Sequence, residues 1–218
     1  LGAPVFLNAM GRGSLPADHP LLFSPARRLA LSQADVVVVI GTPLDFRLGY
    51  GRPPVFSDQA KVIQVDFEAT DIGKNRPIEV GIPGDAKAVL TQLTQEIEAR
   101  RPSQWVRELR ERESEIRHQD EPFLNSDAVP IHPLRLCREI RDFLDRDATV
   151  VGDGGDIVTF AARVLDIYLP GHWLDPGPMG CLGVGTGYAM AAKLARPLEQ
   201  VLIVNGDGSF GLNGMEFD

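Results

Sequence analysis

The sequence is poor in cysteine and has no long apolar run, and each absence removes a class of protein. Its 2 cysteines among 218 residues, Cys137 and Cys181, are too few for a disulfide framework and lack the paired spacing of a metal site. They fit a reducing compartment, so we expect a cytoplasmic protein. No apolar run reaches the roughly 20 residues that span a bilayer, so we expect no membrane partner.

Positive charge is also scarce. Lysine and arginine total 22 against 30 aspartates and glutamates, which gives a net charge of −8. Proteins that bind nucleic acids concentrate lysine and arginine against the phosphate backbone, so we expect no nucleic-acid partner. The densest basic stretch, residues 107–117, is interleaved with glutamate, which is typical of a solvated helix face. The remaining composition is that of an ordinary globular protein.

The first part of the chain alternates expected strands with expected helices. Val36–Ile40 is a run of β-branched residues, typical of a parallel strand covered by helices on both faces. Further strands are expected at 4–7, 61–65 and 78–82, and helices at 25–33 and 86–100. Asp85 is suited to cap the second of these helices. This order predicts a Rossmann-like, doubly wound α/β domain over residues 1–102.

A linker and a second α/β block follow. We expect the linker at residues 103–130, with a polar helix at 105–117 and a loop at 120–130. Residues 131–218 then predict a second parallel sheet, with elements at 132–144, 149–151, 156–165, 188–194 and 201–204 and a helix beginning near Gly214. The chain starts at Leu1 without methionine and ends at Asp218 within that helix. We therefore expect a piece of a longer protein.

The motif Gly206-Asp207-Gly208-Ser209 follows the apolar strand 201–204. Ligands bind at the carboxyl ends of parallel strands, and glycines let backbone N–H groups approach a phosphate at a helix N-terminus. Asp207 is a hard oxygen ligand of the kind that Mg²⁺ takes beside phosphate oxygens. By itself the motif is more often a plain turn than a phosphate and metal site.

Two further glycine-rich loops favour the second interpretation. Residues 150–156 again run from a strand through Gly154 and Gly155 into a helix, beginning at Asp156. Residues 177–187 hold five glycines in eleven positions, which adds chain entropy that folding must overcome. Such a loop is favoured where backbone touches a ligand, although a tight contact between helix and sheet also explains residues 183–187.

The order and the residue patterns of these three loops resemble those of the C-terminal cofactor domain of thiamine diphosphate enzymes. The resemblance is strongest to acetolactate synthases and their relatives, oxalyl-CoA decarboxylase and 2-hydroxyacyl-CoA lyase. Residues 25–36, 66–75 and 84–86 resemble the middle domain of the same enzymes. The resemblance thus spans nearly the whole chain, and it implies thiamine diphosphate and Mg²⁺ as cofactors.

The resemblance assigns roles to residues of the three loops. Asp207 would ligate Mg²⁺, with further ligands downstream of Asp218. The diphosphate would be held by Gly206, Gly208 and Ser209 from one side and by Gly154, Gly155 and Asp156 from the other. The Gly180 carbonyl would accept a hydrogen bond from the aminopyrimidine. Leu182 would support the bent cofactor, where acetolactate synthases usually have methionine, a substitution that fills similar space.

Arg47 matches an arginine at the active-site mouth of acetolactate synthases, where a guanidinium suits a 2-oxo acid carboxylate; the alternative is an ordinary loop arginine. Phe46 stands where true acetolactate synthases commonly have an acidic residue, a departure that bears on FAD use and on a role in branched-chain amino acid biosynthesis.

The resemblance implies decarboxylation of a 2-oxo acid and transfer of the remaining fragment to a second carbonyl, with chemistry supplied by the cofactor. The activating glutamate belongs to an N-terminal domain that residues 1–218 do not contain. We therefore expect these residues alone to be inactive and the whole protein to be a homodimer or tetramer. Two alternatives are an acyl-CoA lyase or oxalyl-CoA decarboxylase, and a non-catalytic module whose middle domain binds FAD or ADP.

Overall fold

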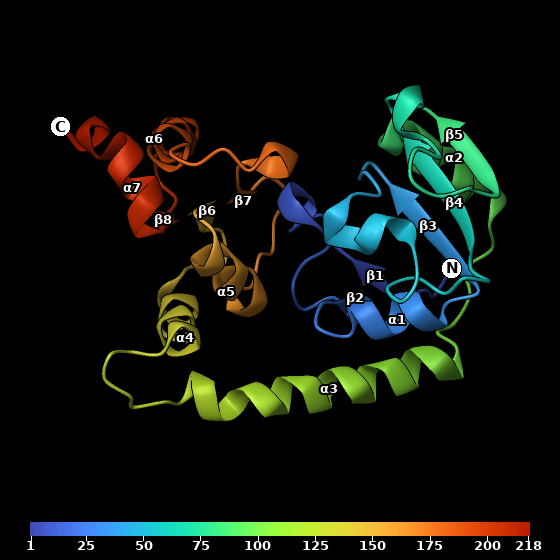
Figure 1. Ribbon diagram of the computed structural model, residues 1–218, viewed down its shortest axis with the longest axis horizontal. Coiled ribbons are helices and arrows are strands. Elements are labelled where there is room, and N and C mark those ends of the chain that lie inside the picture. Colours follow the sequence, from blue (N-terminus) through green and yellow to red (C-terminus); the bar gives the residue numbers. More distant parts are fainter. The chain divides into compact units, whose positions relative to one another are not determined.

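The computed structural model describes residues 1–218 as two compact units. Unit 1 comprises residues 1–4 and 25–113, and unit 2 comprises residues 5–24 and 114–218. Each unit is built on a three-stranded parallel sheet accompanied by helices, as Figure 1 shows. The α/β class with parallel sheets that the sequence predicts is confirmed.

The sheet of unit 1 has the order β3-β4-β5, with β3 at Val36–Ile40, β4 at Lys61–Asp66 and β5 at Val80–Pro83. All neighbours are parallel, and Val38 pairs with Ile63, which pairs with Val80. Val37 and Val39 are buried, whereas Val36 and Val38 are 52% and 43% exposed. Alternate side chains of a strand point to opposite faces, so the face that carries Val36 and Val38 is open. The expectation that helices cover both faces of this strand is therefore wrong here.

Two helices flank this sheet in sequence. The first, α1, runs from Arg27 to Gln33, and α2 runs from Ala86 to Glu96. The Asp85 side chain accepts a hydrogen bond from the Ala88 N–H at 2.9 Å, which confirms the predicted N-cap. Helix α2 ends four residues before the predicted Arg100, because Ile97 turns to extended backbone.

A single side chain, that of Arg76, holds the long connection between β3 and β4 by hydrogen bonds. Its guanidinium donates to the carbonyl oxygens of Gly51, Ser57, Asp58 and Ala60 at 2.6–3.3 Å, and it lies over the Phe56 ring. The planar fork of five N–H donors is what makes several simultaneous contacts possible.

We therefore predict that Arg76→Ala destabilises the domain formed by unit 1. Each hydrogen bond from a charged donor contributes about 1.5–3 kcal/mol to the free energy of unfolding. Removing the guanidinium should therefore lower the free energy of unfolding by at least ~2 kcal/mol, measured by thermal unfolding of the whole protein. Arg76→Lys supplies the charge without the fork and should restore only part of the stability. The exposed Arg100→Ala is the control, and equal effects of Arg76→Ala and Arg100→Ala would contradict the prediction.

The sheet of unit 2 has the order β7-β6-β8, with β6 at Thr149–Asp153, β7 at Trp173–Leu174 and β8 at Val201–Asn205, all parallel. Strand β6 is buried along its whole length. The core beneath it is formed by buried side chains of α4, of α5 and the segment after it, and of all three strands: Leu134, Cys137, Val150, Ala161, Val164, Leu165, Ile167, Trp173 and Val204.

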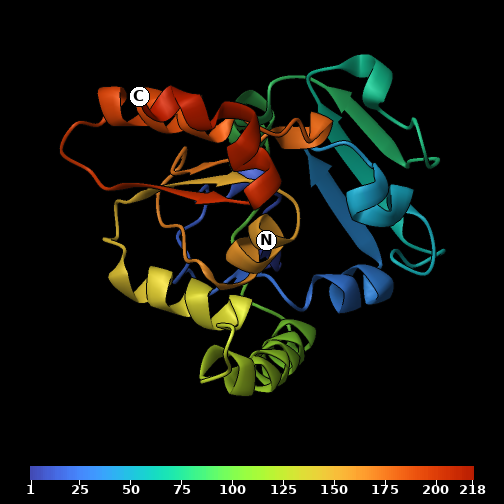
Figure 2. The same cartoon turned by 60° about the vertical axis from the view of Figure 1, so that its left-hand side comes forward.

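The helices of unit 2 lie on both faces of this sheet. Helix α4 covers Pro133–Phe143 and α5 covers Asp156–Val164, while α6 covers Gly185–Ala195 and α7 covers Asp207–Asn213. Figures 1 and 2 show α4 and α5 on one side of the strands and α6 on the other. His132, the first residue of the element expected at 132–144, caps α4 by accepting from the Leu134 N–H at 3.2 Å.

Two segments differ from the sequence prediction. Strand β1, Val5–Phe6, pairs only with β2, Leu22–Phe23, and belongs to unit 2 instead of extending the first sheet. Helix α3 runs from Gln104 to Leu124, through Pro122 and the predicted loop. Its last turns are fixed by an ion pair of Asp120 with Arg163 of α5 at 2.5 Å, a contact between residues far apart in sequence. None of the helices combines the length and the apolar composition that a bilayer span requires.

Candidate functional site

Asp153, the last residue of β6, organises the carboxyl edge of the unit 2 sheet. Its side chain is 1% exposed and accepts hydrogen bonds from the N–H groups of Gly183 at 3.1 Å and Gly185 at 2.7 Å. Its carbonyl oxygen accepts from the Gly206 N–H at 2.8 Å and from the Ser209 hydroxyl at 2.6 Å. One residue therefore joins all three glycine-rich loops. Asp153 is not among the residues that the sequence predicts for the site, although its place between Gly152 and Gly154 at a strand end indicates a role there.

The first two loops touch through glycines. Gly154 has a φ of +151°, and a Cβ there would lie 2.9 Å from the Gly206 nitrogen. A Cβ built on Gly206 would lie 3.6 Å from the Gly154 Cα. A side chain at Gly154 would push the loops apart, whereas a Cβ at Gly206 would make only an ordinary van der Waals contact. Gly154 therefore allows β6 and β8 to deliver two backbones to one place.

Each of these loops leads directly into a helix. Helix α5 begins at Asp156 after the N-cap Gly155, and α7 begins at Asp207 after the N-cap Gly206. Neither cap residue has a side chain to accept from the first N–H groups, so these donors stay available for a ligand. The start of α7 corrects the predicted helix start near Gly214, where a 3₁₀ turn, Gly214–Phe217, follows instead.

The two aspartates that open these helices, Asp156 and Asp207, are exposed. The space where side chains of Gly155 and Gly208 would stand holds no protein atom within 4 Å. Ser209, by contrast, is 2% exposed, and its hydroxyl lies within hydrogen-bonding distance of two backbone carbonyls, those of Asp153 and Gly206. In this structure the Ser209 hydroxyl faces the protein, so its backbone N–H is the donor left for a ligand.

The third loop divides into an open half and a packed half. Gly180 is left-handed, with a φ of +64°, and nothing lies within 4 Å of its would-be Cβ. Leu182 is 44% exposed. Gly185 is packed so tightly that a Cβ would lie 2.8 Å from the Asp153 side chain, which is the helix–sheet contact considered above. Cys181, in the same half of the loop as Leu182, is exposed.

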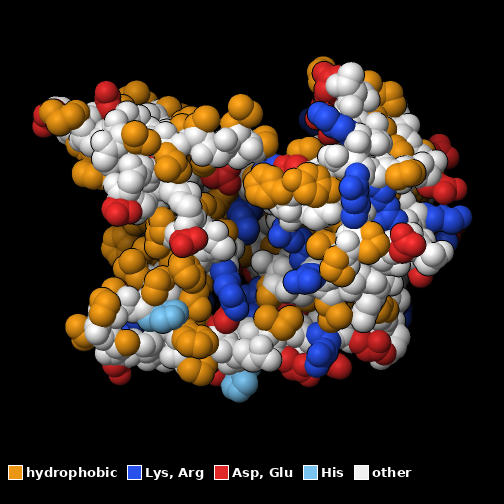
Figure 3. Space-filling view, viewed as in Figure 1, with side chains coloured by type: hydrophobic (Ala, Val, Ile, Leu, Met, Phe, Trp, Pro, Cys, Tyr) orange, Lys and Arg blue, Asp and Glu red, His pale blue; other side chains and the backbone are white.

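Apolar side chains are exposed around this third loop and along the helices beside it. Figure 3 shows hydrophobic side chains scattered over the surface of α6 and α7. Those more than half exposed in this region are Met179, Leu194, Leu198, Leu212, Met215 and Phe217. The exposed Leu182 side chain can therefore offer apolar contact to a flat ligand.

The donor set at this edge fits a diphosphate with a divalent cation. Uncapped N–H groups of two helices suit phosphate oxygens, and the gaps at Gly155 and Gly208 admit them. For the metal, the chain supplies the exposed Asp207 carboxylate, and no group of three or more His, Cys, Asp or Glu side chains could hold an ion. A magnesium ion here would share its coordination with phosphate oxygens and further ligands, as Mg²⁺ commonly does.

Arg47 lies in unit 1, on the 3₁₀ segment Phe46–Gly51 that follows β3. Its guanidinium donates to both Asp45 carboxylate oxygens, the shortest contact being 2.6 Å. Burial raises the pKa of Asp45, but the hydrogen bonds and charge of Arg47 outweigh burial and leave that pKa below its usual value. Phe46 is 66% exposed. The guanidinium is thus held in one orientation and is not a loosely placed loop arginine.

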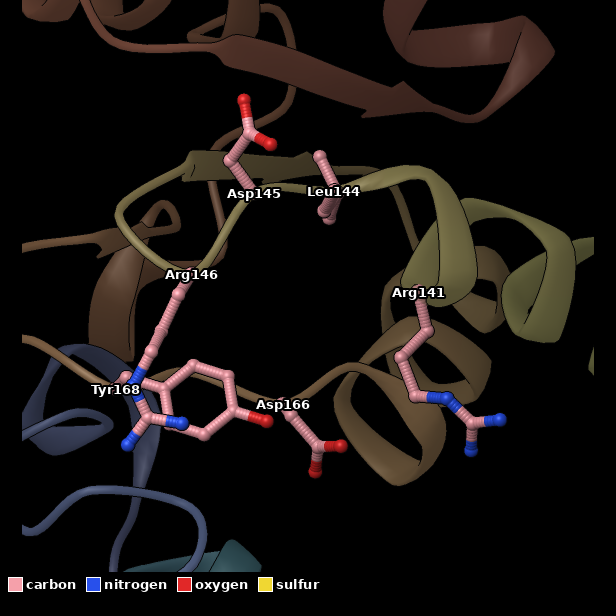
Figure 4. Close-up of a pocket in the computed structure, with 6 residues that line it drawn as sticks. All are labelled: Arg141, Leu144, Asp145, Arg146, Asp166 and Tyr168. Atoms are coloured by element: carbon pink, nitrogen blue, oxygen red, sulfur yellow. The ribbon is translucent and has the colours of Figure 1, made fainter.

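Residues that the sequence left without a role are structural or lie elsewhere. His172 contacts Glu199 at 3.1 Å and Trp173 is buried with its N–H on Asp175. A separate hollow of about 140 Å³ is lined by Arg141, Leu144, Asp145, Arg146, Asp166 and Tyr168. As Figure 4 shows, these side chains come from the last turn of α4, from the turn that follows it and from the segment after α5. None of the predicted site residues lines it.

Comparisons with known proteins match two parts of the chain to two domains of one enzyme family. Residues 1–93 match the model of the thiamine pyrophosphate enzyme central domain, and residues 153–218 match that of the thiamine pyrophosphate enzyme C-terminal TPP binding domain. The chain is 46% identical over 215 residues to the acetolactate synthase large subunit IlvG of Mycobacterium tuberculosis, covering 99% of the chain and 39% of that protein.

A second group of relatives is named for a different reaction. The chain is 38% identical over 227 residues to 2-hydroxyacyl-CoA lyase 2 of Bos taurus and 37% identical over 227 residues to that of Homo sapiens. Each alignment covers 100% of the chain and 35% of the relative. The chain thus spans between about a third and two fifths of the length of the curated relatives it matches.

Proposed function

Since the chain belongs to the thiamine pyrophosphate enzyme family, we propose that it is part of a 2-oxo acid decarboxylase and carboligase of the acetolactate synthase type. The proposal extends to Mg²⁺ as second cofactor, to a homodimer or tetramer as the whole protein, and to the domain limits 1–102, 103–130 and 131–218. The observation that carries it is the contact of Gly154 with Gly206, which directs two uncapped helices to one edge of a sheet.

Specific residues of this edge would hold the cofactor. Asp207 would ligate the magnesium ion. The N–H groups of Gly208 and Ser209 would donate to the diphosphate from α7. Gly206, whose own N–H donates to the Asp153 carbonyl at 2.8 Å, carries no side chain and would therefore let the diphosphate approach. Gly154, Gly155 and the backbone of Asp156 would donate to it from α5. The loops that carry these donors are already held by hydrogen bonds to Asp153, so little reorganisation is needed on binding.

The third loop would position the remainder of the cofactor. The Gly180 carbonyl would accept from its amino group, and the exposed Leu182 side chain would provide an apolar support that excludes water beneath it. When bound, thiamine diphosphate supplies an electron sink for decarboxylation. Arg47 would bind the substrate carboxylate at the mouth of the site, its guanidinium oriented by Asp45.

A 2-hydroxyacyl-CoA lyase is the second candidate, since relatives of that name match the entire chain at 37–39% identity. The higher identity to acetolactate synthases and the paired Arg47, which suits a free carboxylate, favour the first. A third possibility is that the middle domain binds FAD or ADP without catalysis.

The whole protein, supplied with thiamine diphosphate and Mg²⁺, should therefore convert pyruvate to acetolactate. We expect kcat/KM for pyruvate to exceed that for 2-hydroxyacyl-CoA cleavage by at least about tenfold, a difference of roughly 1.4 kcal/mol in transition-state binding. The measurement is steady-state turnover with each substrate at matched enzyme concentration.

Residues 1–218 alone are the control, and they should be inactive with either substrate. Preference for the acyl-CoA substrate would select the second candidate. Binding of FAD or ADP without turnover of either substrate would select the third.

A further inference from the structure

Arg27, the first residue of α1, has no hydrogen-bond or ion-pair acceptor in this structure, although its side chain is partly buried. Fully buried charges in proteins are normally paired, because removing a charge from water without a partner is costly, and partial burial carries part of that cost. Burial lowers the pKa of the Arg27 guanidinium, and the positive charge of Arg47 lowers it further, with no acid acting against them. An unpaired cation therefore stands beside a second cation.

Packing within unit 1 explains why these two arginines are neighbours. Leu31 lies four residues after Arg27, so both project from the same face of α1. Leu31 packs against a buried cluster that includes Leu44 and Leu48, and Leu48 directly follows Arg47. The same face of α1 that packs on the 44–48 loop thus carries Arg27 towards Arg47.

Arg47 cannot turn away to relieve the repulsion. Asp45 binds its Nε and Nη2 atoms and also accepts from its backbone N–H at 3.0 Å. The Asp45 carbonyl accepts from the Tyr50 N–H at 2.8 Å, and the Leu44 carbonyl accepts from Asn75. These contacts leave the Arg47 Nη1 group without an acceptor while fixing its position.

We propose that Arg27 and Arg47 together bind one carboxylate of a small ligand. Two guanidinium groups and the Asp45 carboxylate leave one net positive charge, which a monoanion neutralises and a phosphate dianion would overshoot. Arginine forks suit the planar carboxylate group. This inference rests on the proposed function for the identity of the ligand, a 2-oxo acid, and adds Arg27 as a second substrate-binding residue.

The test is Arg27→Gln in the whole protein. The KM for pyruvate should rise about tenfold to a hundredfold, the loss typical of a charged hydrogen bond, with a smaller change in kcat. The ligand-free protein should keep its melting temperature or gain a few degrees, because an unpaired cation and its repulsion are removed. A purely structural arginine would show the opposite sign. Arg27→Lys should recover part of the pyruvate affinity.

Arg28→Gln is the matched control, since Arg28 is the adjacent arginine and is exposed; its KM should equal that of the wild type. A lower melting temperature with unchanged KM in Arg27→Gln would overturn the proposal while leaving the proposed function intact. Thermal shifts of cofactor-free protein with pyruvate and with inorganic phosphate complete the test. Stabilisation by phosphate alone would overturn the carboxylate assignment. Stabilisation by pyruvate that Arg27→Gln abolishes, in a protein without turnover, would support the site and refute the proposed function.

Discussion

Replacing Asp207 with asparagine in the whole protein should reduce kcat/KM by roughly a thousandfold, equivalent to about 4 kcal/mol, because the proposed ligand of the magnesium ion would lose its charge. The same change should leave the folded protein intact. Asp207 is exposed, and no hydrogen bond or ion pair of its side chain is present in the structure, so α7 loses only the interaction of this charge with the helix dipole, about 0.3–1 kcal/mol. The measurement is steady-state turnover over a range of Mg²⁺ concentrations.

Two features separate this effect from a general disturbance. High Mg²⁺ should recover part of the activity of Asp207→Asn, since weakened metal binding is overcome by mass action. Glu216→Gln, which removes an exposed carboxylate nine residues further along the chain, should have no effect on turnover. A full-activity Asp207→Asn protein, or one whose loss is independent of Mg²⁺, would exclude Asp207 as a metal ligand.

Replacing Asp153 with alanine should produce the largest loss of stability. The Gly183 and Gly185 N–H groups would lose a buried acceptor, and each unsatisfied donor costs about 1–3 kcal/mol. We expect a loss of roughly 3–5 kcal/mol, seen as a melting temperature lower by at least about 6 °C. Cofactor affinity should fall as well, because the three loops lose their common anchor.

Asp153→Asn refines this prediction. Its amide keeps one acceptor oxygen but places an NH₂ group against the second backbone donor, so stability should recover only in part. Asp156→Ala is the control for stability, because this carboxylate begins the next helix but is exposed; about 0.3–1 kcal/mol is expected from its contact with the helix dipole. If Asp153→Ala and Asp156→Ala cost the same, the anchoring role of Asp153 is wrong.

Local sequence was sufficient wherever a pattern repeats over neighbouring residues. Strands β3, β4, β6 and β8 are apolar runs bounded by polar or glycine residues, and all four were predicted within about two residues at each end. The caps at Asp85 and His132 depend only on the three residues that follow each of them. The approximate positions of the three glycine-rich loops, and the α/β class, follow from the same local signals.

Other features depend on contacts that no local pattern contains. The end of α3 is fixed by Asp120 meeting Arg163 of α5, so a segment that reads as loop is helical. Strand β1 pairs with β2, because the partner of a short strand is chosen by the fold and not by its own composition. The start of α7 at Asp207 depends on a β8 strand end held by Asp153.

The sequence by itself determined which residues are available for chemistry, namely the glycines and aspartates that follow each parallel strand, since those types are required for close backbone approach and for metal binding. Only the tertiary structure decided how they are used. It joined three loops at Asp153, turned the Ser209 hydroxyl inward, and set the unpaired Arg27 beside Arg47. Each of these depends on side chains brought together from different elements, and burial and charge act on such pairs only after the chain has folded.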